Sequence, residues 1–149
     1  MNLPEVSAGS VEQVFHMIEH IFKNRELDPN EHQVDSQQPG AWWLSEEGSL
    51  IYIYVHETTT GPTLRLTSPI LHLPIANREQ FYRKLLDLNT DLNSCALSIC
   101  EDIVLVVAQR HTGGLTEQEL DEIVGIVGFV ATTISAKLRT EFGVAAYTK

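Results

Sequence analysis

The stretch TEQELDEIVGIVGFVATTISA, residues 116–136, sets the main constraint on how this chain folds. Thr116 followed by Glu119 has the spacing of a capping box, which predicts the start of a helix. Residues 123–136 of this helix contain no charged side chain. An ordinary surface helix carries a polar face, so a helix without one needs burial on more than one side. We expect its inward stripe to consist of Leu120, Ile123, Val124, Val127, Ala131, Ile134 and Leu138.

Five apolar runs separated by turn residues predict the strands that this helix would cover. They span residues 41–45, 50–56, 63–70, 95–100 and 103–110. Short polar turns join the first three runs, and another joins the last two, so we expect an antiparallel meander followed by a hairpin. Both faces of the second run are largely uncharged. We therefore expect one face of the sheet to be core and the other to be covered as well.

Two more helices complete the predicted order. Ser10 is the expected N-cap of a helix that ends near Asn24, and Asn77 with Gln80 has the form of a capping box that opens a helix to about Leu92. The helix after Thr116 should end near residue 141. The predicted class is α+β, α-β-β-β-α-β-β-α, with helices packed on a twisted antiparallel sheet. The polar stretch 25–40, with two prolines, is expected to be a loop, with a short edge strand near residues 32–35.

Length and charge narrow the class of protein. The chain has 149 residues, of which 43% are hydrophobic, enough for one core, so we expect a single domain over residues 1–149 with loosely ordered ends at 1–9 and 142–149. A net charge of -10 disfavours nucleic acid as a partner. The first residues do not resemble a signal peptide, and no uncharged run is long enough to span a membrane. We expect a cytoplasmic protein with no membrane partner.

Two groups of residues could carry chemistry. His16, Glu19 and His20 match the H-x-x-E-H pattern of inverted zincins. They lie opposite the apolar stripe of their helix and have no obvious third ligand, so a metal-dependent hydrolase is a remote alternative. Cys95 and Cys100 are expected to point to opposite faces of one strand, out of disulfide reach, as reduced, packed thiols. We predict no catalytic residues, no metal and no cofactor.

Two apolar surfaces suggest binding instead. Trp43, Tyr52 and Tyr54 crowd the first two strands, where they either pack in the core or form an aromatic surface for a partner protein. On the predicted third helix, Ile126, Phe129 and Thr132 lie on sides away from the inward stripe. These residues are either buried within a larger core or form a self-association surface, which would make the protein a homodimer.

Residues 66–134 resemble the YbjN-like family of bacterial proteins, which is similar in fold to type III secretion chaperones. The resemblance is carried by LTSPILHLP (66–74), FYRKLLDLN (81–89), CALSICEDIVLVVAQR (95–110) and GLTEQELDEIVGIVGFVA (114–131). These are patterns of apolar spacing and turns. They imply a non-enzymatic domain, often a dimer, that binds extended segments of a client protein.

The leading hypothesis is therefore a non-enzymatic, chaperone-like or regulatory module that binds a protein or peptide client. An alternative is a small-ligand sensor with a pocket lined by Tyr52, Tyr54 and His56.

Overall fold

The computed structural model describes residues 9–148, in which helices and strands follow the predicted order. A 3-10 helix, η1, precedes the first strand. The bounds are α1 Val11–Asn24, η1 Pro29–His32, β1 Ala41–Glu46, β2 Ser49–Thr58, β3 Gly61–His72, α2 Arg78–Asp91, β4 Ala96–Cys100, β5 Ile103–His111 and α3 Glu117–Phe142. This confirms the predicted α+β class.

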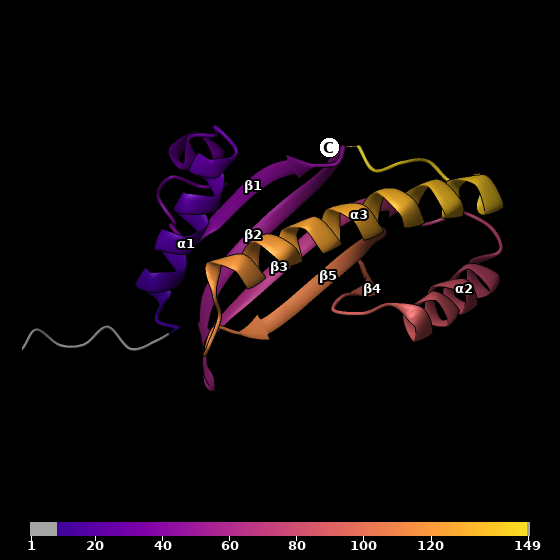
Figure 1. Cartoon of the computed structure of the whole chain (residues 1–149). Helices are drawn as coiled ribbons and strands as arrows, with labels where there is room; N and C mark the ends of the chain where they lie inside the picture. Colours follow the sequence, from indigo (N-terminus) through magenta and orange to yellow (C-terminus); the bar gives the residue numbers. More distant parts are fainter. Residues whose placement is uncertain (1–8, 149) are drawn as a thin grey trace, which may run out of the picture.

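The strands form one five-stranded antiparallel sheet in the order β1-β2-β3-β5-β4. The predicted meander and hairpin are both present. Tertiary pairing adds the contact between β3 and β5, which inserts β5 into the sheet and leaves β4 at its edge. α1 and α3 lie across one face, and α2 lies beside β4 and the C-terminal end of α3 (Figure 1).

The core lies between α3 and the sheet. The predicted inward stripe of α3 is confirmed, because all of its residues are buried except Ile123, which is half-buried. On the sheet, alternate residues of β1 and β2 point towards α1 and α3, as strand geometry requires. The buried strand residues on this face include Trp42, Leu44, Ile51, Ile53, Leu64, Leu66, Val104 and Val106.

α3 is the one described helix that is long and apolar enough, by length and composition, to cross a membrane. Its buried residues pack against the sheet. Two interactions fix its position beside β1 and α1. Gly128 lies against Glu46 of β1, and Arg25 at the end of α1 pairs with both Glu46 and Asp121 of α3. Burial by itself would lower the pKa of Arg25, but the hydrogen bonds that its guanidinium donates to Asp121 and Glu46 outweigh this effect and raise that pKa.

The three predicted helix starts have different outcomes. The Ser10 side chain accepts a hydrogen bond from the Gln13 N–H at 3.2 Å, which confirms the N-cap. Thr116 caps α3 in the same way, although the Glu119 carboxylate pairs with Arg110 instead of completing the box. The capping box predicted at Asn77 is wrong, because this residue has a left-handed backbone (φ 61°) and its side chain makes no capping bond.

Other predictions also need correction. The second face of the sheet is not covered by any described helix, and Tyr52 and Tyr54 lie there half-buried. The expected edge strand in the 25–40 loop is reduced to an isolated bridge between Gln33 and Trp42. Residues 142–149 were expected to be loose, whereas Ala146 pairs with Leu71 of β3. At the other end, the expectation for residues 1–9 falls almost wholly outside the described residues.

Two glycines of α3 provide a matched test of this packing. Gly128→Ala should lower the free energy of unfolding by about 1–3 kcal/mol, because the new Cβ would lie 2.8 Å from the Glu46 Cγ. Gly125→Ala should raise it by about 0.5–1 kcal/mol, because nothing lies within 4 Å of the added methyl group. Urea denaturation followed by circular dichroism measures both. Equal effects would show that α3 does not approach β1 as described.

Candidate functional site: a cleft at the open edge of β5

β5 extends past its neighbour β4 and leaves part of its edge without a partner strand. The pairing of β4 with β5 begins at Ala96, which lies opposite Val107, whereas β5 continues to His111. Just before β4, Ser94 adopts a left-handed backbone (φ 66°) that turns the chain away from β5. Among residues 9–148, no strand pairs with the last part of β5 on this side.

The ladder register shows which backbone groups face the open side. The N–H of Thr112 donates to the carbonyl of Pro62 in β3 at 3.2 Å. Because backbone groups alternate in direction along an antiparallel strand, those of Gln109 point away from β3. The edge of β4 agrees with this register, since the backbone N–H and carbonyl of Leu97 face outward and bond to the Asn89 side chain of α2. Gln109 therefore presents a backbone donor and acceptor at the open edge.

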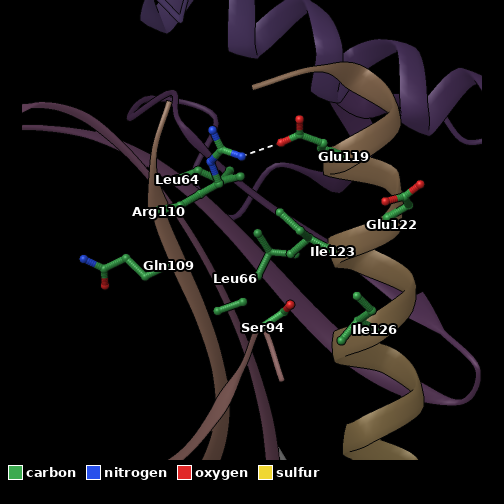
Figure 2. Close-up of a pocket in the computed structure, with 10 residues that line it drawn as sticks. Leu64, Leu66, Ser94, Gln109, Arg110, Glu119, Glu122, Ile123 and Ile126 are labelled. Carbon is green, nitrogen blue, oxygen red and sulfur yellow. Dashed lines mark hydrogen bonds and ion pairs between the residues drawn. The ribbon is translucent and has the colours of Figure 1, made fainter. Parts of the chain in front are cut away.

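An apolar cleft of about 330 Å³ lies beside this edge, between the sheet and α3. Its floor comes from Leu64, Leu66 and Ala108, and its wall from Ile123 and Ile126 of α3. Figure 2 shows Leu66 and Ile123 meeting in the middle of the cleft, with Ser94 and Ile126 at one end. The complete lining is Leu64, Leu66, Ser94, Ala108, Gln109, Arg110, Glu119, Glu122, Ile123 and Ile126.

An ion pair between strand and helix closes the other end of the cleft. The Arg110 guanidinium contacts the Glu119 carboxylate (Figure 2). It also donates to the backbone carbonyls of His111 at 2.8 Å and Gly113 at 2.9 Å, which hold it against the end of β5. Glu122 follows one turn later on α3 and accepts from Gln118 at 3.2 Å. With one cation and two carboxylates, this end of the cleft is acidic.

The residues predicted to bind partners are divided between the two faces of the molecule. Ile126 lines the cleft, and Phe129 on the next turn is 60% exposed. Thr132 bonds to the Ser49 hydroxyl at 2.8 Å and to the Glu47 carbonyl at 2.9 Å, which ties α3 to the turn between β1 and β2.

Trp43, Tyr52 and Tyr54 lie on the uncovered face of the sheet, opposite the cleft. The rings of Tyr52 and Tyr54 stack with centroids 6.2 Å apart, and Trp43 packs against His32 of η1 at 4.3 Å. Burial raises the pKa of the Tyr54 hydroxyl. The residues proposed for a small-ligand pocket are spread over two open depressions, one with Tyr52 and Tyr54 and the next with Tyr54 and His56.

The residues of the hydrolase alternative lie on the solvent side of α1. The His16 side chain is 82% exposed, and that of His20 is 57% exposed and contacts Glu117 of α3. No group of three His, Cys, Asp or Glu side chains that could hold a metal ion occurs in residues 9–148. The arrangement is that of a polar helix face.

The two thiols are free but differ in surroundings. Cys95 is half-buried against the core, and burial raises the pKa of its thiol, which makes it a weak nucleophile at neutral pH. Cys100 is exposed, so the prediction that both thiols are packed is wrong for this residue.

The sequence patterns did not point to the cleft residues Leu64, Leu66, Ala108 and Arg110. One signal was present, because the predicted strands at 95–100 and 103–110 differ in length and an unequal hairpin must leave an overhang. The overhang borders a cleft only on the face of the sheet where α3 packs. The sequence patterns do not show which face that is.

Comparison with known proteins gives one family and one fold. Residues 18–148 match the family model described as T3SS (YopN, CesT) and YbjN peptide-binding chaperone 1. A solved structure titled "Crystal Structure of the ExsC-ExsE Complex" is similar over 85% of this chain and 95% of that chain, with 14% sequence identity and a TM-score of 0.64. At this identity the likeness concerns the fold alone. No curated protein matches the sequence.

The raised pKa of Cys95 can be tested by alkylation. In a Cys100→Ser variant, iodoacetamide at pH 7.5 should modify Cys95 more slowly than free N-acetylcysteine, because only the thiolate reacts and a raised pKa reduces its fraction. The rate is measured by mass spectrometry, with Cys95→Ser as the control that reports the exposed Cys100. A Cys95 rate above that of the free thiol would indicate an activated nucleophile and contradict this description.

Proposed function

The chain belongs to the family of type III secretion and YbjN peptide-binding chaperones, and we propose that it binds an extended segment of a client protein at the cleft beside β5. One observation carries this proposal. The open backbone edge at Gln109 lies directly beside the apolar cleft, which is lined by Leu66, Ile123 and Ile126. An edge provides backbone hydrogen bonds, and a cleft beside it provides a pocket for a side chain, which are the two parts of recognition by strand addition.

The backbone of the client would continue the line of β4 along β5. Its N–H and carbonyl groups would pair with those of Gln109, which the register turns towards the open side. Successive side chains of a strand point to opposite faces. Every second client residue would therefore point to the α3 side, where an apolar side chain fills the cleft.

Charge favours a basic client segment. The chain has a net charge of -10, and Glu119 and Glu122 lie at the polar end of the cleft beside a single cation, Arg110. Acidic surfaces attract basic partners and speed their association, an effect that salt screens. A segment with an apolar residue flanked by lysine or arginine therefore fits the cleft. Its apolar side chain matches the apolar floor, and its basic side chain matches the acidic end.

A longer client would also reach the uncovered face of the sheet. Tyr52 and Tyr54 lie there half-buried with none of α1, α2 and α3 above them, and the half-buried Trp43 packs against His32 of η1. Tyrosine and tryptophan are frequent anchors of protein interfaces. We include these three residues in the client-binding surface as contacts separate from the cleft.

The proposed role requires no catalytic step. His16 and His20 are exposed, and the Cys95 thiol is a weak nucleophile, so neither supplies an activated group. Two free thiols fit a reducing compartment, which supports the cytoplasm as the place where the chain meets its client.

Peptide binding at the cleft can be measured with a designed probe, fluorescein-labelled Lys-Val-Thr-Leu-Lys-Val-Thr-Lys. Ile126→Lys should weaken binding at least about fivefold, because it removes the apolar wall and adds a like charge. Ile75→Lys is the matched control, since Ile75 is 98% exposed, lies outside the cleft and undergoes the same change in charge. Fluorescence anisotropy reports both affinities.

A backbone variant separates strand addition from simple pocket binding. Gln109→Pro removes the N–H at the open edge, where proline is tolerated because no ladder bond is lost. Weaker probe binding by a variant that stays folded supports strand addition. The proposed site is wrong if Ile126→Lys and Ile75→Lys bind the probe equally well.

A homodimer is a second candidate, favoured by exposed apolar side chains on α3. Phe129 is 60% exposed and Ile126 is 36% exposed on adjacent turns. Thr132, also expected at this surface, is held by the turn between β1 and β2. Because Ile126 also lines the cleft, a dimer formed here would compete with client binding.

Light scattering over a range of concentrations tests this surface. If the wild type dimerises through α3, Phe129→Glu should make it monomeric, because a carboxylate would be buried without a partner. Leu86→Glu on α2 is the comparison, since Leu86 is 66% exposed and lies on a different helix from Phe129. A monomeric wild type, or a folded dimeric Phe129→Glu variant, would contradict the α3 interface.

A further inference from the structure

We propose that β3 carries a second strand-addition site for extended peptides, at Ile70–His72, which the chain's own C-terminal segment occupies. This segment comprises residues 144–148 and follows α3. The site lies on the opposite side of β3 from β5. It is distinct from the cleft and does not depend on client binding there.

The edge of β3 is free for another strand because β2 separates from it. The pairing of β2 with β3 ends at Tyr52 and Thr67. Beyond that point the Ser68 hydroxyl, not a backbone N–H, donates to the Leu50 carbonyl at 2.7 Å. Pro69 has no N–H to offer, and a bulge between Pro69 and Leu71 shifts the register. The backbone groups of Ile70 and His72 therefore need a different partner.

The C-terminal segment provides that partner in the manner of a bound peptide. Gly143, with a left-handed backbone (φ 63°), ends α3 and lets the chain turn back. The Tyr147 N–H then donates to the Ile70 carbonyl at 3.0 Å, and the His72 N–H donates to the Ala145 carbonyl at 3.4 Å. Ala146 lies opposite Leu71 as an antiparallel pair. These are the contacts that a separate client strand would make.

Side chains show what kind of segment fits. The small side chain of Ala146 lies opposite the fully buried Leu71, while the Tyr147 ring stacks on His72 with centroids 5.6 Å apart. The Thr148 N–H approaches the His72 Nε2 at 3.5 Å. The geometry therefore selects an extended segment in which a small residue is followed directly by an aromatic one.

Space beside the C-terminal segment allows it to be exchanged. Tyr147 lines two cavities, one of about 390 Å³ bounded by β2, β3 and α3, and one of about 330 Å³ on the uncovered face beside Tyr52 and Leu105. Two backbone bonds between strands, the Thr148 N–H contact with His72, one ring contact and the packing of Val144 against the core hold the segment.

Removing the segment should expose the site to the same sequence added as a separate peptide. The experiment uses a chain that ends at Gly143 and the fluorescein-labelled peptide Gly-Val-Ala-Ala-Tyr-Thr, which has the sequence of residues 143–148. Saturable binding is expected to the shortened chain and at least about tenfold weaker binding to the full chain, because an occupied site lowers the apparent affinity by the fraction that is open. A peptide methylated at the tyrosine nitrogen lacks the donor to Ile70 and should bind at least about fivefold more weakly.

Absence of saturable binding by a folded shortened chain would overturn the proposal, as would equal binding of the methylated peptide. If the shortened chain does not fold, Tyr147→Ala in the full chain replaces it. That variant loosens the occupant and should bind the peptide about threefold or more tightly than the wild type, and equal binding would again overturn the proposal. Ile126→Lys should leave this binding unchanged, so failure here is distinguishable from failure at the cleft.

Discussion

The packing of one long apolar helix, α3, across a single face of an antiparallel sheet is the constraint on which the rest of the structure depends. Each strand must turn its apolar residues towards α3, which sets the register of the sheet. Gly128 permits the close approach to β1, and Arg25 connects the ends of α1, β1 and α3 through Glu46 and Asp121. Among residues 9–148, none of α1, α2 and α3 covers the opposite face, and its aromatic residues remain half-buried.

A sheet with strands of unequal length leaves backbone N–H and carbonyl groups unpaired at its edges. In this chain, different segments cover different edges. The polar segment after η1 covers the edge of β1, where the Val34 N–H donates to the Ala41 carbonyl. The Asn89 side chain covers β4 at Leu97. The C-terminal segment covers β3, whereas the end of β5 has no partner strand among the described residues. A peptide-binding function follows from this difference, because a covered edge stabilises the monomer and an open one accepts another chain.

Periodicity and turn residues were sufficient to predict the order of elements and most of their bounds. The buried stripe of α3 could be predicted because apolar residues on one side of a helix recur every three or four residues. The left-handed backbone of Asn77 could not be predicted, because asparagine is common both at helix N-caps and in left-handed turns. The covered second face was predicted from the uncharged pattern of Tyr52 and Tyr54, but half-buried aromatic residues on an open sheet give that same pattern.

The amino-acid sequence by itself determined the α+β class, the helix that forms the core and the acidic charge. These properties depend on local spacing and composition. Only the tertiary structure decided that β5 pairs with β3, that Leu66 and Ile123 meet in one cleft, and that Ala146 returns to β3. Each of these contacts joins residues far apart in the chain, and which of them form depends on the one arrangement that buries α3.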